Sequence, residues 1–366
     1  MVLPLHGGHA PGWLVKRMKA LAGEVVRLIV QEDGADGFLR RMSEPYWFQA
    51  FGCALGFDWH SSGLTTVVTG VLKETLKADM HGVMMAGGKG NASRKALAEI
   101  ERAGTGLGLP TTKVQELRYA SRICAKVDNA AIQAGYPIYH HAFFMSERGD
   151  WAVVQQGINT NDGTARRYHW LSEHVKNYII EPHDAIIGER VTSGVLNMTA
   201  KEADENRRVC VDLVKDDPRR LISSIKKLGT EGTSLDAWTE AGKPSYNLEG
   251  YEMPTDLNWR VFSDLYDVQP RNYEELLAFK GVGPATVRAL ALVAQLVYGK
   301  PTSWRDPVKF SFAHGGKDGV PYPVNTNVMD GTVRFLEEIF KSAELERELK
   351  SDALRRLGHL SHSWGL

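Results

Sequence analysis

Cysteine is scarce in this chain of 366 residues. Its three cysteines, Cys53, Cys124 and Cys210, lie far apart and form no CxxC pair. This spacing argues against a disulfide framework and a thiolate zinc site and favours a reducing compartment, so we expect a cytoplasmic protein. An excess of one charge is also lacking, because 44 lysine and arginine residues balance 44 aspartate and glutamate residues. Any nucleic-acid site must therefore be a local basic patch.

Long hydrophobic runs are absent as well. No apolar stretch approaches the roughly 18 residues that a membrane span needs. The N-terminal string MVLPLHGGHAPGW lacks the charged-then-apolar order of a signal peptide. We therefore expect no membrane partner. A hydrophobic content of 43% and a charged content of 24% are those of an ordinary globular protein that is long enough for two or three cores.

The pattern of the chain changes near residue 195. Before it, strand-like runs at 25–30, 138–145 and 151–158 alternate with helical segments, and the turn SERGD between the last two runs predicts a β-hairpin. After it, helical patterns dominate. The prediction is an α+β protein with a mixed α/β domain containing antiparallel strands at 1–195 and an all-α domain at 196–366. The amphipathic segment TVRFLEEIFKSAELERELKSDALRRL should pack on the second core.

A glycine-containing turn lies within ELLAFKGVGPATVRALALVA, residues 275–294. The order of apolar residues, glycines and proline resembles the helix-hairpin-helix motif of DNA repair and recombination proteins. Such a turn presents backbone amides at a helix N-terminus, where they can bind a phosphate oxygen. The alternative is a glycine-bearing corner in a helix bundle. The residues expected to contact nucleic acid here are Lys280, Gly281, Val282, Gly283 and Thr286.

Basic residues of one sign line the predicted helix at 113–135. Arg118, Arg122 and Lys126 repeat at steps of four, and like charges at this spacing repel each other. We interpret them as a ridge that faces phosphates, with a plain solvated surface as the alternative. Other basic residues stand in glycine-rich or arginine-rich strings, where the alternative is a solvated turn. The further nucleic-acid candidates are Lys89 in AGGKGNASRK, Arg167 in ARRYHW and Lys317 in HGGKDG.

An Asp-x-His pair occurs in GFDWHSSGLTT. Asp58 and His60 could share a divalent metal or act as a base and the group that orients it, and Asp128, His140 or His141 could complete the site. We predict Asp58 and Asp128 as ligands of Mg²⁺ or Mn²⁺, with His60 and His140 assisting catalysis. A local hydrogen-bonded Asp–His pair is the alternative.

Some helix-hairpin-helix proteins are DNA glycosylases, and the string PYPVNTNV is similar to the one that carries their catalytic aspartate. Asn325 stands at that position, and Ala285 stands near the position of the lysine used by bifunctional members. An amide cannot act as a carboxylate base, and alanine cannot form a Schiff base. The residues therefore favour the other predictions over a glycosylase, which stays as an alternative.

Several long strings are similar to an archaeal and bacterial family known as domain of unknown function seven-six-three. They include PYWFQAFGCALGFDWHSSGLTT, YASRICAKVDNAAIQAGY, WAVVQQGIN and FAHGGKDGVPYPV, and the similarity covers nearly the whole chain. The resemblance implies a role in nucleic-acid metabolism and no specific reaction. We predict a DNA-processing protein, with a divalent-metal-dependent nuclease as the first reading. A DNA glycosylase and a non-catalytic DNA-binding module are the alternatives.

Overall fold

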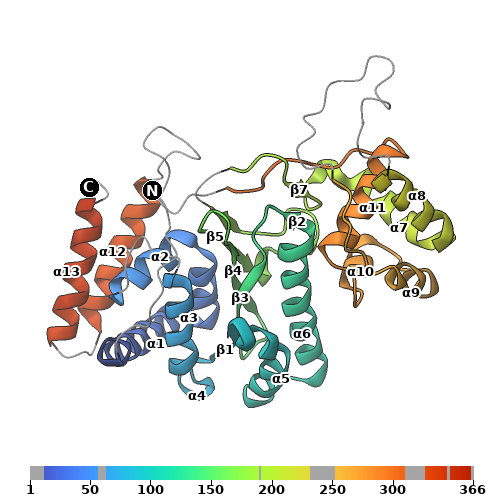
Figure 1. Cartoon of the computed structure of the whole chain (residues 1–366). Helices are drawn as coiled ribbons and strands as arrows, with labels where there is room; N and C mark the ends of the chain where they lie inside the picture. Colours follow the sequence, from blue (N-terminus) through green and yellow to red (C-terminus); the bar gives the residue numbers. More distant parts are fainter. Residues whose placement is uncertain are drawn as a thin grey trace.

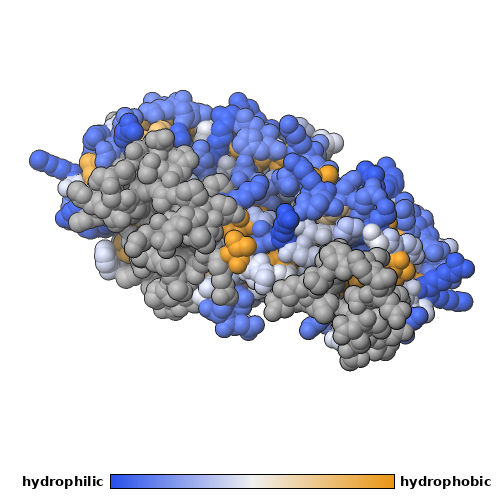
Figure 2. Space-filling view, turned by 90° about the horizontal axis from the view of Figure 1, so that it is seen from above, coloured by the Kyte–Doolittle hydropathy of each residue, from blue (hydrophilic) through white to orange (hydrophobic). Residues whose placement is uncertain are grey.

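The computed structural model describes residues 12–56, 63–188, 191–230, 252–309, 326–343 and 347–363. Within these residues, helices cover both faces of an antiparallel sheet, and a further group of helices extends from one side (Figure 1). The predicted mixed α+β class is confirmed. No helix in the described ranges is long and apolar enough to cross a bilayer. In the view of Figure 2, the described surface is mainly hydrophilic, and its hydrophobic residues form small, separate groups.

The sheet has the strand order β1-β3-β4-β5-β6, and every neighbouring pair is antiparallel. The strands are β1 (Val83–Lys89), β3 (Ile138–Ser146), β4 (Trp151–Asn159), β5 (Thr164–Leu171) and β6 (Ala185–Ile187). The predicted hairpin is confirmed, because Met145 of β3 pairs with Trp151 of β4 across the SERGD turn. A separate short ribbon joins β2 (Ile132–Gln133) to β7 (Leu196–Asn197).

Two hydrophobic cores lie on opposite faces of this sheet. Successive side chains of a strand point to opposite faces. Ala142 and Phe144 of β3 accordingly belong to the first core, whereas Phe143 and Met145 belong to the second. The two neighbouring histidines at 140 and 141 must therefore also face opposite sides.

Helices from both ends of the chain cover the first core. They are α1 (Gly12–Ser43), α2 (Pro45–Ala54), α3 (Gly63–Thr75), α4 (Ala78–His81), α12 (Thr326–Ser342) and α13 (Arg347–Ser363). The strand predicted at 25–30 is wrong, since this run lies inside α1. Its residues Val25, Val26 and Ile29 are fully buried at helical spacing, so packing along one helix face overrides the β preference of valine and isoleucine.

The two C-terminal helices lie beside the N-terminal ones (Figure 1). Leu336, Ile339 and Phe340 of α12 are buried in the first core together with residues of α1 and α2. The expectation that this segment packs on the second core is therefore wrong. An amphipathic pattern shows that a helix buries one face, but it does not identify the surface that receives that face.

The second core begins under α5 and α6 and continues into the helices that follow residue 200. The elements next to the sheet are η1 (Gly90–Lys95), α5 (Ala96–Gly106), α6 (Thr111–Lys126) and the π-helical turn η2 (Val127–Ala131). The helix predicted at 113–135 thus ends earlier than expected. The α-helix changes to the wider π-helical turn η2, and the chain then enters β2. This arrangement places Asp128 against the sheet.

The predominance of helices after residue 195 is confirmed within the described residues. These helices are η4 (Lys201–Ala203), α7 (Asp204–Lys215), α8 (Pro218–Thr230), α9 (Arg260–Val268), α10 (Tyr273–Ala278) and α11 (Pro284–Leu296), and the short η3 (Ser172–His174) precedes them. Buried residues of α7, α9, α10 and α11 share the second core with α6. The turn between α10 and α11 is thereby brought next to the C-terminal end of α6.

Candidate functional site

A pocket of about 420 Å³ opens where sequence-distant segments meet. Its walls come from η1, α6 with the following η2, the start of β3, and the turn between α10 and α11. Three segments for which the sequence predicts anion binding therefore border one space. The polar or glycine lining residues are Ser93, Arg94, Ser121, Arg122, Lys126, Asn129, His141 and Gly283.

The turn between α10 and α11 joins two helices at the predicted place. Gly281 has φ +99°, and a Cβ atom there would lie 2.9 Å from Val261, so this position requires glycine. Gly283 precedes Pro284, the first residue of α11. Within the described part of the chain, the amides of Gly281 and Gly283 have no hydrogen-bond acceptor. These amides are available to an oxygen ligand.

Val282 in this turn and Thr286 in the following α11 are buried. Their side chains are 1% and 3% exposed, and Val282 belongs to the second core. The prediction that Val282 and Thr286 contact nucleic acid is therefore wrong for their side chains, because these pack in the interior. Lys280, by contrast, is exposed.

Lys126 holds the turn against α6. Its Nζ donates hydrogen bonds to the carbonyl oxygens of Val282 and Phe279, the latter at 3.3 Å. Burial lowers the pKa of Lys126, and the nearby charge of Arg122 lowers it further. The predicted phosphate contact of Lys126 is thus replaced by a structural role, because its donors are directed to backbone carbonyls.

Unbalanced positive charge surrounds the pocket. Arg94 and Arg122 line it and are exposed, and Lys89 and Lys280 lie on the segments that form it. In the described ranges, none of these four cations forms an ion pair with a carboxylate. An anion that enters the pocket would therefore meet cations that need not first release an acidic partner.

Arg118 departs from the predicted ridge. Its Nη1 lies 3.3 Å from the carboxylate of Glu101 on α5. This ion pair reduces the like-charge repulsion on which the prediction of a phosphate contact rested. We therefore assign Arg118 to the α5–α6 contact rather than to the pocket.

Ser121 and His141 form a hydrogen-bonded pair in the pocket wall. Ser121 Oγ lies 2.8 Å from His141 Nε2, and His141 Nδ1 lies 2.8 Å from Gln155 Oε1 on the neighbouring strand β4. Burial is the main cause that lowers the pKa of His141, and its hydrogen bond to Gln155 opposes that change. The imidazole is therefore neutral at pH 7. A neutral histidine beside a hydroxyl can act as a general base.

Asp128 lies behind this pair and is fully buried. Its Oδ2 accepts hydrogen bonds from the Gln155 amide and, at 3.0 Å, from Trp170 Nε1, while its Oδ1 is bonded to His183 Nε2. The prediction that Asp128 is a metal ligand is corrected. Its carboxylate already has three protein partners and orients Gln155, which in turn contacts His141.

The backbone of β1 supports His141 through a glycine. Gly87 has φ +91°, and a Cβ atom there would lie 2.1 Å from the carbonyl oxygen of His141. The Gly87 amide donates to Glu99 at 2.8 Å, and its carbonyl accepts from Lys73 Nζ at 2.6 Å. This end of β1 therefore has little freedom to move away from an added methyl group.

We expect Gly87→Ala to lower the free energy of unfolding by at least about 2 kcal/mol, because it adds a backbone clash to an unfavourable φ angle. Gly90→Ala is the matched control, since Gly90 also has a positive φ, +58°, but has no atom within 4 Å of an added Cβ. Urea denaturation monitored by circular dichroism measures both changes. Equal losses in the two variants would show that the contact with His141 does not matter.

His140 and Arg167 lie on the opposite face of the sheet. His140 is 1% exposed, and its Nε2 lies 3.0 Å from Thr69 Oγ1 of α3. Arg167 is also 1% exposed and donates to Gln49 at 3.1 Å. The predicted catalytic role of His140 beside Asp128 and the predicted nucleic-acid contact of Arg167 are therefore corrected. Neither side chain reaches the pocket or the solvent.

Three predicted site residues, Asp58, His60 and Lys317, lie outside the described residues. Among the residues that are described, no group of three or more histidine, cysteine, aspartate or glutamate side chains could hold a metal ion. The Asp58-based metal site stays a prediction.

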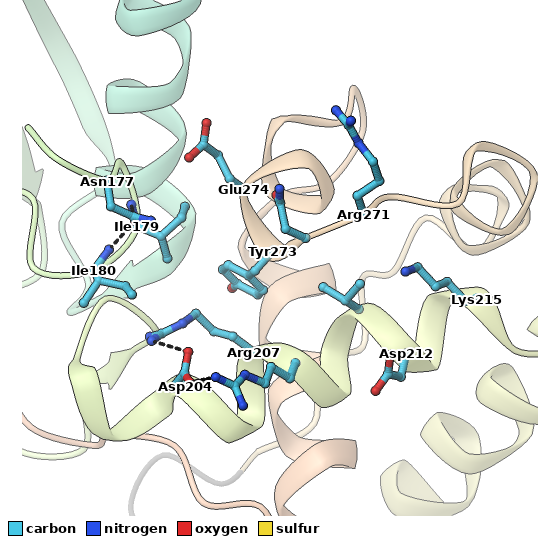
Figure 3. A pocket seen from close by; sticks show the side chains of 13 residues that line it. Asn177, Ile179, Ile180, Asp204, Arg207, Asp212, Lys215, Arg271, Tyr273 and Glu274 are labelled. Carbon is cyan, nitrogen blue, oxygen red and sulfur yellow. Dashed lines mark hydrogen bonds and ion pairs between the residues drawn. The ribbon is translucent and has the colours of Figure 1, made fainter.

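A second pocket, of about 370 Å³, lies between α7 and the start of α10 (Figure 3). Its arginines are engaged by acidic groups or carbonyls. Arg207 lies 3.4 Å from Asp204, Arg208 lies 2.7 Å from the same carboxylate, and Arg271 is bonded to Glu275. This balanced set of charges is less suited to an anion than the pocket beside α6.

Sequence reasoning missed Ser121 as a functional candidate. Ser121 lies between the apolar positions Ala120 and Cys124 on the buried side of α6. A serine on a buried helix stripe needs a hydrogen-bond partner, which is a signal that could have directed attention to it. Its partner, His141, is 20 positions away in sequence, on a different element.

Comparison with known proteins places the chain in a family. Residues 1–324 match the family described as "Protein of unknown function (DUF763)", which covers most of the 366 residues. No curated protein and no solved structure matches the chain. The resemblance of the long strings to this family is thereby confirmed, whereas the likeness to helix-hairpin-helix repair proteins has no support from these comparisons. The chain belongs to the DUF763 family of proteins of unknown function.

Proposed function

We propose that this protein binds the sugar-phosphate backbone of DNA in the pocket bordered by η1, α6 and the α10–α11 turn. One observation carries the proposal. The exposed guanidinium groups of Arg94 and Arg122 and the unbonded amide of Gly283 line the same pocket, although they come from three distant segments. Guanidinium groups and helix N-terminal amides are both donors suited to phosphate oxygens.

The type of contact sets the kind of recognition. Donors that bind phosphate oxygens position a strand but carry no sequence information. Binding should therefore depend strongly on salt and weakly on sequence. The neutral charge of the whole chain agrees with a local site, because the cations around the pocket are not part of a general positive field.

The predicted nuclease activity remains part of the proposal. Asp58 and His60, its first candidates for a Mg²⁺ or Mn²⁺ site, lie outside the described residues, and Asp128 is committed to other partners. The glycosylase alternative needs a carboxylate from another position, because Asn325 stands where the catalytic aspartate would be. A non-catalytic DNA-binding module remains the alternative, because a DNA-binding measurement alone does not distinguish it from a nuclease.

Reversing two charges tests the proposed surface. We expect Arg94→Glu combined with Arg122→Glu to weaken DNA binding at least about tenfold. It should also reduce the slope of log K against log salt concentration by about 2, because each lost phosphate contact removes about one unit. Fluorescence anisotropy with labelled single- and double-stranded DNA of two unrelated sequences, at several salt concentrations, measures both quantities.

The matched control changes the net charge equally at another place. Lys16 on α1 and Lys77 before α4 are both exposed, and neither residue lines the pocket. Lys16→Glu combined with Lys77→Glu should leave both the affinity and the salt slope nearly unchanged. An equal loss in both double variants would assign the effect to net charge and reject the pocket as the binding site.

A further inference from the structure

The wall of the same pocket holds a hydroxyl and an imidazole that the proposed binding does not use. Ser121 Oγ and His141 Nε2 are 2.8 Å apart, and both residues line the pocket that Arg94 and Arg122 border. We propose that Ser121 is the nucleophile, and His141 the general base, of a site that cleaves phosphodiesters. This inference rests on the proposed function for the identity of the substrate, and it names the reaction at that site.

The hydrogen-bond network determines which histidine nitrogen carries the proton. The Gln155 amide nitrogen donates to Asp128, so the Gln155 oxygen is the atom that faces His141 Nδ1 at 2.8 Å. An amide oxygen can only accept, and a neutral imidazole carries one proton. His141 therefore holds its proton on Nδ1 and has a lone pair on Nε2. The Ser121 hydroxyl donates to that lone pair.

This polarity is the one that activates a serine nucleophile. A serine hydroxyl is a weak nucleophile until a neighbouring base takes its proton, and the base needs a third group that orients it. Gln155 supplies the orienting oxygen, and Asp128 holds the Gln155 amide in place. Gln155 and Asp128 are therefore positioning residues, whereas Ser121 and His141 would contact the reacting atoms.

The proposed first step transfers the phosphoryl group to the serine. Ser121 Oγ attacks phosphorus as its proton passes to His141 Nε2, and the bond from phosphorus to one sugar oxygen breaks. His141 returns the proton to that leaving oxygen. The guanidinium groups of Arg94 and Arg122 and the Gly283 amide border the same space and would stabilise the charge on the remaining phosphate oxygens.

The second step restores the enzyme. Water attacks the phosphoserine phosphorus and gives a proton to His141 Nε2, the bond from phosphorus to Ser121 Oγ breaks, and the serine oxygen takes that proton back. The sum is one phosphodiester plus one water converted into one phosphomonoester and one alcohol. No metal, oxidant or other reactant enters these two steps.

Labelling with a fluorophosphonate tests the nucleophile without DNA, because this reagent phosphonylates activated serines. We expect one adduct per chain in the intact mass of the full protein, mapped by peptide mass spectrometry to Ser121. Ser121→Ala should abolish this adduct, and His141→Gln should slow its formation at least about tenfold, with thermal melting used to confirm that both variants fold. The absence of an adduct on Ser121 in the folded wild-type protein would overturn the inference.

The pH profile separates a general base from a merely structural histidine. Because burial lowers the pKa of His141 below its ordinary value of 6.5, the labelling rate at pH 6.5 should exceed half of its value at pH 8. Gln155→Met removes the orienting oxygen and with it the hydrogen bond that opposes the lowering of the His141 pKa, so the profile should move to lower pH. An unchanged profile in this variant would reject Gln155 as a positioning residue.

Two outcomes distinguish this inference from the proposed function. DNA binding without a Ser121 adduct would keep the binding proposal and reject the nucleophile. A Ser121 adduct without DNA binding would keep the nucleophile and reject DNA as its substrate. Strand cleavage by the wild-type protein in EDTA, abolished by Ser121→Ala while that variant still binds DNA, would support the nucleophile and the DNA-binding site and would reject the metal-dependent mechanism.

Discussion

Replacing Asp128 by alanine is expected to lower the free energy of unfolding by about 3–5 kcal/mol, the range found when one partner of a buried charged network is removed. Asp128 is fully buried and receives hydrogen bonds from Gln155, Trp170 and His183. The alanine variant leaves these polar groups buried without their shared acceptor, and each such group costs about 1–3 kcal/mol. Chemical denaturation of the purified variant measures the loss.

Asp128→Asn is the matched control because it keeps the volume and one acceptor oxygen. We expect it to lose clearly less stability than Asp128→Ala, since Gln155 and Trp170 can still donate to the remaining oxygen. A small effect of Asp128→Ala, below about 1 kcal/mol, would mean that the carboxylate does not organise this part of the core. The metal-ligand role would then have to be considered again.

Acidification is expected to destabilise the protein as the pH falls below about 6.5. Burial lowers the pKa of His140 to about 3, and burial also lowers the pKa values of His141 and His169. The ordinary value near 6.5 applies to the unfolded chain, so between about pH 6.5 and 3 the unfolded chain binds a proton that His140 in the folded protein does not. The stabilisation is complete above pH 6.5 and is lost as the pH falls through this window.

The size of the effect follows from the same numbers. For His140 alone, pH 5 lies about 1.5 units below the unfolded-state pKa of 6.5 and still above the folded-state pKa of about 3, so the loss is about 2 kcal/mol at 1.36 kcal/mol per unit. The other two buried histidines add losses of the same sign. Denaturant titrations at half-unit pH intervals measure the slope. His140→Gln should reduce this slope, because it removes one of the buried groups that bind a proton only in the unfolded chain over this window.

The functional consequence of such acid sensitivity differs between the two faces of the sheet. His140 and His169 contact the first core, away from the pocket, through Thr69 and the Met42 carbonyl. His141 contacts the pocket through Ser121. The loss of stability at low pH would therefore reflect protonation of all three histidines. The labelling rate of Ser121, measured where the protein stays folded, would reflect protonation of His141 alone.

Several parts of the fold could be predicted from local sequence. The β3–β4 hairpin has two runs of β-forming residues around a short polar turn, and the α10–α11 turn has glycines at the bend and a proline at the start of the next helix. Both features depend on residues within about 20 positions. The run at 25–30 shows the limit of such reasoning, because its β-branched residues are outweighed by burial along α1.

Other predictions failed because they needed distances across the chain. Asp128 and His140 are only 12 positions apart, yet they lie on opposite faces of the sheet, since His141 rather than His140 points toward α6. Lys126 and Arg118 have the spacing of a cationic ridge, but their partners, Val282 and Glu101, come from other elements. A sequence pattern gives the face of a helix but not the identity of what packs there.

The sequence by itself determined some local features of this protein: the hairpin, the glycine turn, the predominance of helices after residue 195, and basic side chains able to meet an anion. Only the tertiary structure decided which of these residues share a pocket, and it selected Arg94, Arg122, Ser121 and His141 over Asp128, His140 and Arg167. The physical reason is that local patterns depend on backbone preferences and periodicity over a few residues. Which distant residues come together in one pocket depends instead on strand order, on the alternation of side chains across the sheet, and on packing against segments more than 100 positions away.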